Sequence, residues 1–474
     1  MIFNSLTFIV FFLVLVGLHY TIRSWKARKF ILLIGSYLFY AAWNPPFVIL
    51  LWISTMIDWF AANRLETERV RGKRILYLLL SLTANLGLLA FFKYGGFFLE
   101  NFTTLVGFYG AEFQAAKPDI ILPVGISFYT FQTLSYTLDV YHKRAHPARS
   151  FLDFALYVTF FPQLVAGPIV RATHFIPQCE APKRATAQQF FWGLFMMSLG
   201  LFQKVVLADA MLAPAAEAVF GFTGGALHAL DAWLGVLAFS GQIFFDFSGY
   251  STCAIGVALC FGFSLPDNFR VPYAAIGFSD FWRRWHISLS TWLRDYLYFP
   301  LGGNRAGELR TVVNLMMVML IGGLWHGASW TFVAWGGLHG LFLIVERGLR
   351  RRFADVAWVR SMSARVFFWV LTYFLINMTW VFFRAVDFSS AGLIIASMLG
   401  LAGPGAQILT TLSILKIVVV VSALVGVHLT QRAINLEEAM SRAPGWLRTA
   451  AWTAMLFLLI ITQGGGNAFI YFQF

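Results

Sequence analysis

The sequence predicts an all-helical protein that crosses a membrane many times. Hydrophobic residues make up 59% of the 474 positions and charged residues only 12%, whereas soluble globular proteins carry roughly 25% charged residues. Long apolar runs alternate with short basic clusters, which is typical of transmembrane helices rather than barrel strands. We therefore expect a polytopic bundle of about 11 to 12 transmembrane helices, with re-entrant and interfacial half helices between them.

The excess of basic residues fits a membrane protein better than a nucleic-acid-binding one. The net charge is +13, but the Lys and Arg residues gather in short segments between apolar runs, where they set topology and meet anionic lipid headgroups. The three cysteines form no CxxC pair, so neither a zinc site nor a disulfide framework is indicated. We expect membrane lipid, and no nucleic acid or metal, as a partner.

The first third of the chain contains five apolar segments that predict membrane crossings. Basic clusters at 23–29, 64–74 and 142–144 fall on one side of these crossings, and the excess of Lys and Arg places that side in the cytoplasm. The tract 100–117 is expected to be an outer loop. The predicted crossings are residues 4–22, 30–43, 47–62, 75–94 and 120–140.

The middle of the chain departs from simple crossings. Residues 151–166 are apolar but shorter than the roughly 20 residues that a span needs, so we expect a pair of re-entrant or surface-buried half helices. Residues 188–207 predict a full crossing. Residues 229–263 are long and contain Gly249, which favours either one broken helix or a span followed by a half helix.

A turn with the sequence HGASW interrupts the next apolar region. The flanking segments 311–325 and 331–345 each have about 15 residues, less than a full crossing. This length predicts a turn below the membrane surface, at the floor of a water-filled depression. Basic residues at 270–310 and 347–352 are expected in the cytoplasm. Later crossings are predicted at 367–383, 414–427 and 450–462, and 391–401 is ambiguous.

His326, inside this turn, is the strongest candidate for chemistry. An ionisable side chain at membrane depth is costly and indicates function by default, and a histidine can act as a general base near neutral pH. Small neighbours such as Gly323 and Gly327 leave room for a substrate. The alternative is a neutral histidine that is hydrogen-bonded between two helices.

The segment 281–296 reads as one amphipathic helix, with tryptophans on one face and polar residues on the other. His286 falls at the edge of the apolar face, and such a helix is expected to lie in or near the membrane interface. Interfacial anchoring explains most of its residues. Arg283 and Arg294 share a flank and could bind a phosphate-bearing ligand from the cytoplasm.

Several pieces of the sequence resemble the membrane-bound O-acyltransferase family. The similarity is greatest to the bacterial branch that includes the alginate O-acetylation and teichoic acid D-alanylation membrane proteins. One departure is that Thr252 and Cys253 stand where that branch often has Asp-Met. The pieces are IGSYLFYAAWNPP, NLGLLAFFKY, LPVGISFYTFQTLSYTLDVY, FPQLVAGPIVR, FFDFSGYS, FWRRWHISLSTWLRDYLYFPLGGN and GGLWHGASW.

The resemblance implies a single acyltransferase domain over residues 1–474, with a catalytic core at about 120–346. It implies that His326 and His286 are catalytic. We also predict a set of donor-binding and cavity-lining residues around them. The donor-binding set is Arg283, Arg294, Asn304 and Arg305, and the cavity-lining set is Asp246, Ser248, Trp325 and Ser329.

The implied reaction moves an acyl group, expected to be acetyl, from a cytoplasmic thioester such as acetyl-CoA towards hydroxyls of an extracytoplasmic polysaccharide such as alginate. The resemblance also implies an extracytoplasmic acetyltransferase partner, the bacterial cytoplasmic (inner) membrane as the location, and no bound cofactor. An acyl-group exporter without its own chemistry is the alternative, in which intramembrane His, Asp and Lys residues would relay protons.

The positions of the basic clusters lead to a prediction about topology. Cysteines introduced at positions 71 and 351 should stay unlabelled when intact cells are treated with a membrane-impermeant thiol reagent, because both positions lie in predicted cytoplasmic clusters. Labelling after permeabilisation is the control for reactivity. Strong labelling of either position in intact cells would contradict the predicted orientation.

Overall fold

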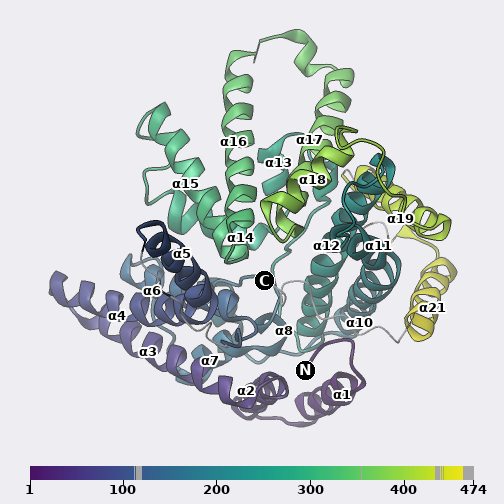
Figure 1. Ribbon diagram of the computed structural model, residues 1–474. Coiled ribbons are helices and arrows are strands. Elements are labelled where there is room, and N and C mark those ends of the chain that lie inside the picture. The colour runs from purple at the N-terminus through teal and green to yellow at the C-terminus, as the bar shows by residue number, and fades with distance from the viewer. Residues whose placement is uncertain are drawn as a thin grey trace. The chain divides into compact units, whose positions relative to one another are not determined.

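The computed structural model describes residues 1–110, 113, 120–353, 355–432, 438, 440 and 442–462. Within these ranges the chain is helical and contains no strand, apart from an isolated bridge between Leu227 and Ala406. The helices form two compact units, of which the first comprises residues 1–197 and 253–266 and the second residues 198–252 and 267–474. We call them unit 1 and unit 2, and Figure 1 shows their helices.

Unit 1 is built mainly from the first half of the chain. The ends of two helices, α10 and α12, pass from one unit to the other along the sequence. Its elements are α1 (Leu6–Thr21), α2 (Trp25–Ala41), η1 (Pro45–Phe47), α3 (Val48–Thr67), α4 (Arg71–Leu89), η2 (Ala90–Tyr94), α5 (Gly95–Phe108), α6 (Ile126–Tyr141), α7 (Phe151–Thr159), α8 (Phe161–Leu164), α9 (Ala172–Glu180) and α10 (Ala187–Leu201).

Unit 2 carries both histidines singled out from the sequence. Its core is rich in aromatic side chains and includes the fully buried Trp285, Trp335 and Trp380. Its elements are η3 (Phe202–Leu212), α11 (Ala213–Phe220), α12 (Ala229–Cys260), η4 (Pro272–Ala274), α13 (Phe278–Trp282), α14 (Ile287–Leu293), η5 (Arg294–Tyr298), α15 (Glu308–His326), α16 (Trp330–Arg352), η6 (Ala357–Arg360), α17 (Met362–Arg384), α18 (Phe388–Met398), α19 (Thr411–Thr430) and α21 (Gly445–Thr462).

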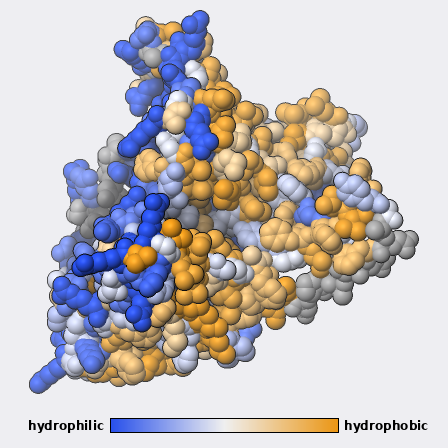
Figure 2. Space-filling view, turned by 90° about the vertical axis from the view of Figure 1, so that its left-hand side faces the viewer, coloured by the Kyte–Doolittle hydropathy of each residue, from blue (hydrophilic) through white to orange (hydrophobic). Residues whose placement is uncertain are grey.

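The helices confirm a polytopic membrane protein. Among the described residues, nine helices are long and apolar enough to cross a membrane, and α1 and α18 are apolar but shorter. Apolar side chains are also abundant on the surface, as the orange area in Figure 2 shows. In α17, for example, Val366, Phe367 and Val370 are each at least half exposed. Such surfaces are stable in lipid but not in water.

A buried carboxylate joins three helices of unit 1. Asp58 on α3 accepts two hydrogen bonds from Asn85 Nδ2 on α4, at 3.0 and 2.9 Å, and another from Ser81 Oγ. The Asn85 Oδ1 atom accepts from Ser54 and from Thr133 on α6. Because a polar group in an apolar medium needs a partner, this network fixes how the three helices pack.

Two basic residues that were predicted to lie in a loop belong instead to the buried part of α2. Arg28 and Lys29 are 3% and 8% exposed. Lys29 forms an ion pair with Asp153 on α7, and Arg28 Nη1 donates to the carbonyl of Lys183 at 2.8 Å. The expectation of a loop over 23–29 was wrong because α2 already begins at Trp25, and protein groups rather than water stabilise both charges, with Asp153 neutralising Lys29.

Two other predicted boundaries were also wrong. The expected outer loop at 100–117 begins as α5, which continues from α4 through the π-helical turn η2, and residues 111–112 and 114–119 lie outside the described ranges. The expected break near Gly249 is absent, since α12 is one helix of 32 residues. A Cβ at Gly249 would meet the carbonyl oxygen of Gly200, so this glycine permits close packing rather than a break.

The two half helices predicted at 151–166 are confirmed as α7 and α8, which are almost completely buried in unit 1. Further along the chain, the helices on either side of the HGASW turn are longer than expected. The helix α15 has 19 residues and α16 has 23, about 28 and 34 Å at 1.5 Å per residue. Both are long enough to cross, so the length argument for a submerged turn was wrong.

The α15–α16 hairpin depends on glycine contacts between its helices, which lie side by side (Figure 1). A Cβ added to Gly323 would overlap the carbonyl oxygen of Phe332, and a Cβ added to Gly336 would overlap that of Met319. Small residues at such crossings let two backbones approach closely. The crossing lies one turn before His326, so it also sets where that histidine stands.

We expect Gly323→Ala to destabilise the hairpin by about 1 to 3 kcal/mol, because the new methyl group must displace backbone. The matched control is Gly337→Ala, whose Cβ would lie 3.4 Å from Leu320 Cδ2, an ordinary contact, and which should change stability by no more than about 1 kcal/mol. Thermal unfolding of both detergent-solubilised variants is the measurement. Equal stability of the two variants would contradict the packing described.

Candidate active site

Two histidines from separate elements meet in unit 2. His326 is the last residue of α15, and His286 lies directly before α14. Their ring centres are 6.2 Å apart, and the two residues are 2% and 0% exposed. The structure therefore brings together the two residues that the sequence predicted to be catalytic.

The backbone at His286 differs from the single amphipathic helix that the sequence predicted. The segment forms α13 and α14 with a break between them, and His286 has a left-handed φ of 44°. Trp285 is 0% exposed and Trp282 and Trp292 are 8% exposed, so these tryptophans fill the protein core rather than anchor a helix in the membrane interface. A non-glycine residue at positive φ is uncommon and must be held by its surroundings.

The loop before α13 holds His286 in place. His286 Nδ1 lies 3.1 Å from Asn268 Oδ1, and Ile287 N donates to the Asn268 carbonyl at 2.9 Å. Two residues further along, Arg270 N donates to the carbonyl of Arg284 at 2.9 Å. The two segments thus run against each other, and this pairing stabilises the unusual backbone at His286.

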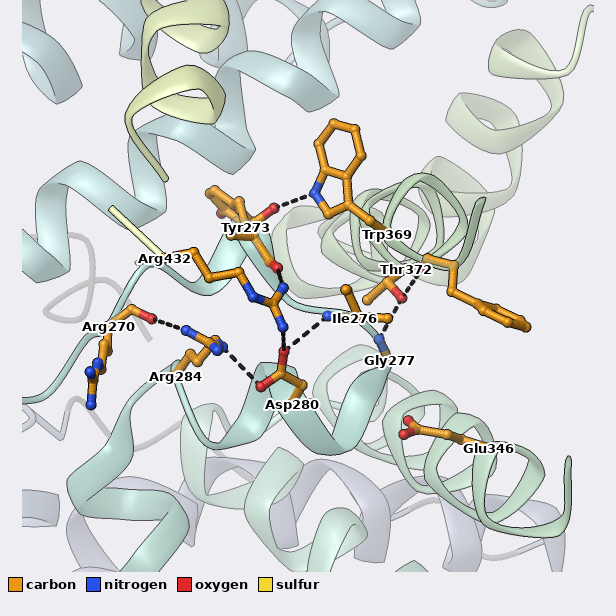
Figure 3. A network of polar contacts seen from close by, with 12 residues as sticks. Arg270, Tyr273, Ile276, Gly277, Asp280, Arg284, Glu346, Trp369, Thr372 and Arg432 are labelled. Carbon is orange, nitrogen blue, oxygen red and sulfur yellow. Dashed lines mark hydrogen bonds and ion pairs between the residues drawn. The ribbon is translucent and has the colours of Figure 1, made fainter. Parts of the chain in front are cut away.

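Asp280 on α13 anchors the same loop from its other end (Figure 3). Its carboxylate accepts from Ile276 N at 3.1 Å, from Arg284 Nε at 2.9 Å and from Arg432 Nη2 at 3.1 Å. From α17, Trp369 Nε1 donates to the Tyr273 carbonyl at 2.9 Å and Thr372 Oγ1 accepts from Gly277 N at 2.8 Å. The three bonds to the Asp280 carboxylate are charge-assisted. Together with the two neutral bonds from α17, they give a rigid support for the residues around His286.

Aromatic rings surround His326. The ring centres of Trp325 and Trp335 each lie 5.0 Å from its imidazole, and that of Phe383 lies 5.5 Å away. Phe383 comes from the end of α17, so three helices contribute to this enclosure. The histidine is therefore shielded from bulk water, and interactions with a bound substrate are stronger than they would be in water.

His286 is in a similarly apolar setting outside the membrane-spanning helices. Phe247 on α12 packs against its ring at 4.6 Å and Trp325 at 5.9 Å. Burial lowers the pKa of His286 from its usual 6.5 to about 3, because an imidazolium would be poorly solvated there. The ring is accordingly neutral at physiological pH.

The predicted cavity-lining residues make contacts of two kinds. Trp325 contacts both histidines, and Ser329 begins α16 by accepting a hydrogen bond from Thr331 N at 3.1 Å. Asp246 instead forms an ion pair with Lys204 on η3. It lies on a different face of α12 from Phe247, and its neighbour Ser248 contacts Gln203 at 3.4 Å. Both of these contacts join α12 to η3.

The four predicted donor-binding residues all lie on the surface of unit 2 and are exposed. Arg283 directly follows α13 as its C-cap, and Arg294 pairs with Asp295 at 2.8 Å. Asn304 and Arg305 belong to a glycine-containing loop before α15, which Asn314 holds by donating to the carbonyls of Leu301 and Gly303 at 3.1 and 3.0 Å. These side chains are available to a ligand in solution, but none of them contacts the histidine pair.

A comparison with known families decides which kind of protein carries this site. Residues 75–384, which include both histidines, match the model of the membrane-bound O-acyltransferase (MBOAT) family. The chain belongs to this family. It is therefore a multi-pass membrane O-acyltransferase, and the resemblance noted in the sequence motifs is confirmed.

Relatives with assigned names cover most of the chain. It is 40% identical over 438 residues to a peptidoglycan O-acetyltransferase of Helicobacter pylori, covering 85% of this chain and 80% of the relative. It is also 40% identical over 400 residues to a probable alginate O-acetylase of Azotobacter vinelandii, covering 84% and 78%. A teichoic acid D-alanyltransferase of Streptococcus thermophilus is 29% identical over 48% of this chain. These relatives are named for the transfer of acetyl or D-alanyl groups.

The sequence did not reveal Asn268 or Asp280. Neither residue carries a motif of its own, and Asn268 reaches His286 only because the chain folds back over 18 residues. A polar residue with a basic residue and a proline shortly after it is an ordinary loop pattern.

Among the described residues, no group of three or more His, Cys, Asp or Glu side chains is arranged to hold a metal ion.

Proposed function

We propose that this MBOAT protein moves acetyl groups from cytoplasmic acetyl-CoA towards hydroxyls of a polysaccharide outside the bacterial cytoplasmic membrane. The observation that supports this most is the enclosed pair of His326 and His286, 6.2 Å apart in an aromatic setting within a membrane protein. A thioester is already activated, so the site needs only a base for the hydroxyl and a place where both substrates meet.

In the proposed step His326 acts as the general base. The hydroxyl oxygen attacks the thioester carbonyl carbon, and its proton moves to a ring nitrogen of His326. The carbon–sulfur bond then breaks, and the histidine returns the proton to the leaving thiolate, so no net proton is consumed. An enclosed site favours this sequence because it excludes water that would hydrolyse the thioester.

The start of α16 supports the same chemistry electrostatically. This helix begins at Trp330, four residues after His326, and its Trp335 ring touches the histidine. The amino end of a helix carries a partial positive charge and unsatisfied N–H groups. Negative charge that develops on a carbonyl oxygen near His326 would be stabilised by this helix end.

The names of the relatives support the proposed acceptor. Two of the relatives are named for peptidoglycan and alginate, and both polymers present sugar hydroxyls outside the cytoplasmic membrane. We therefore propose a polysaccharide acceptor, with a separate extracytoplasmic protein completing the transfer. Deleting the gene in its native host and measuring base-labile acetate on purified exopolysaccharide and on purified peptidoglycan tests this. Unchanged acetate on both polymers would contradict a polysaccharide acceptor of either kind.

Replacing His326 tests the base directly. We expect His326→Ala and His326→Gln to lose acetyl transfer by about 10²- to 10⁴-fold, because neither side chain can accept the hydroxyl proton. Polymer acetylation and the amount of protein in the membrane are measured together. If His326 only joined helices through hydrogen bonds, Gln would preserve activity and Ala would lower the protein level. A Gln variant with near-normal acetylation would refute the base and direct attention to His286.

The exposed arginines give a prediction about the donor. Arg283→Ala and Arg305→Ala should each raise the apparent KM for acetyl-CoA, in at least one case about tenfold or more, because phosphate contacts of this kind contribute about 1.5 to 3 kcal/mol. Arg294→Ala should have less effect, since Asp295 already neutralises this side chain.

Initial rates of CoA release by purified protein in nanodiscs provide the measurement for these arginine variants. Arg69→Ala is the control, because Arg69 is also exposed and lies in a predicted cytoplasmic cluster outside the donor set. If all four variants keep the wild-type KM, the donor enters at another surface.

A further inference from the structure

The side-chain amide of Asn268 can be oriented without ambiguity. The backbone N–H of Ser288 lies 3.3 Å from one atom of this amide, and the Ser288 hydroxyl lies 2.8 Å from the same atom. A backbone N–H can only donate, so this atom must be the oxygen. The amide nitrogen is then the atom that donates to Ser251 Oγ at 3.2 Å.

This orientation decides the tautomer of His286. Its Nδ1 atom lies 3.1 Å from the same Asn268 oxygen, and an amide oxygen only accepts. Nδ1 must therefore carry the proton, because two acceptors would repel each other at this distance. Since the buried ring is neutral, its other nitrogen, Nε2, has a lone pair and no proton.

Among the rings that pack against His286 in the described structure, one is titratable and could exchange a proton with its Nε2 atom. The imidazole packs against Phe247, Trp325 and His326, of which only His326 can exchange a proton near neutral pH. A ring-centre separation of 6.2 Å exceeds the roughly 5 Å of a direct in-line bond between imidazoles. A water molecule or a small shift on substrate binding would connect them.

We propose that Asn268 is a positioning residue that fixes the direction of a hydrogen-bond chain ending at His326. Asn268 accepts from His286 Nδ1, and His286 Nε2 accepts from an N–H of His326, directly or through one water. The second nitrogen of His326 then carries the lone pair that takes the proton from the incoming hydroxyl. When that proton arrives, His286 stabilises the imidazolium, and the proton leaves with the thiolate as in the step described above.

This role deepens the proposed function and rests on His326 as the base. It also explains why the backbone at His286 is held at a φ of 44°. The same residue, Asn268, binds the ring through its side chain and the following N–H of Ile287 through its carbonyl. One residue thereby fixes both the place of His286 and its tautomer.

The first test compares Asn268→Ala with a matched loss of another buried amide. We expect Asn268→Ala to lower kcat for acetyl transfer about 10- to 100-fold, the size typical of losing a partner that orients an active imidazole, with the KM for acetyl-CoA changed by less than about threefold. The control is Asn377→Ala on α17, since Asn377 is 1% exposed and donates only to its own helix. Equal kcat losses in both variants would overturn the proposal.

The second test uses Asn268→Asp, which separates positioning from packing. A carboxylate still accepts from His286 Nδ1 and from Ser288, so the tautomer is preserved and kcat should exceed that of Asn268→Ala. The negative charge should raise the pKa of His286 and of the hydrogen-bonded His326. The acidic limb of the pH–rate profile should therefore move to higher pH by about one unit or more. Activity is then lost at a higher pH as the solution is acidified. An Asp variant that is less active than Ala, with an unshifted profile, would overturn the proposal.

A third measurement does not depend on activity. Nitrogen NMR of histidine-labelled protein, with the His286 signals assigned from a His286→Gln variant, should show a protonated Nδ1 in the wild type and a mixture of tautomers in Asn268→Ala. A protonated Nε2 of His286 in the wild type would refute the proposed hydrogen-bond chain, because this nitrogen could then not accept from His326. If His326→Gln stayed active while these signals were as expected, the base assignment would fail but the tautomer assignment would stand.

Discussion

In the proposed mechanism the neutral ring of His326 acts as the base, and the contact between Asn268 and His286 fixes which nitrogen of His286 can accept a hydrogen bond from it. This hydrogen bond of 3.1 Å joins a loop to the start of α14. The orientation of the amide is imposed in turn by a backbone N–H, which cannot reverse. The rest of unit 2 keeps this loop rigid, through the Asp280 carboxylate and the side chains of α17 (Figure 3).

The second requirement is that His326 reaches the same place from another helix. The crossing of α15 and α16 at Gly323 and Gly336 brings the two backbones into contact, and α16 starts directly after the turn that carries His326. Bulky rings then close around the histidine. Close packing, polar support and aromatic shielding therefore act on one site, while the apolar outer surface keeps the protein in lipid.

The sequence was sufficient for the fold class and for singling out two histidines that the structure brings together, because hydropathy and the motifs around His286 and His326 are local signals. It was not sufficient for how His286 is held. A helical wheel treats 281–296 as one helix, whereas tertiary contacts from Asn268 stabilise a left-handed residue in the middle. The ion pair between Asp246 and Lys204 could not be predicted either, since Lys204 comes from a π-helical segment that hydropathy cannot distinguish from an ordinary span.

The central claim is that the donor thioester reaches the His326–His286 pair. A cryo-electron microscopy structure of the protein in lipid nanodiscs with a non-hydrolysable thioether analogue of acetyl-CoA would test it most directly. The account predicts that the acyl carbonyl lies close to the His326 ring, with room between them only for the acceptor hydroxyl. The CoA phosphates should point towards the surface that carries Arg283 and Arg305. An analogue bound with its acyl end remote from both histidines would contradict the account.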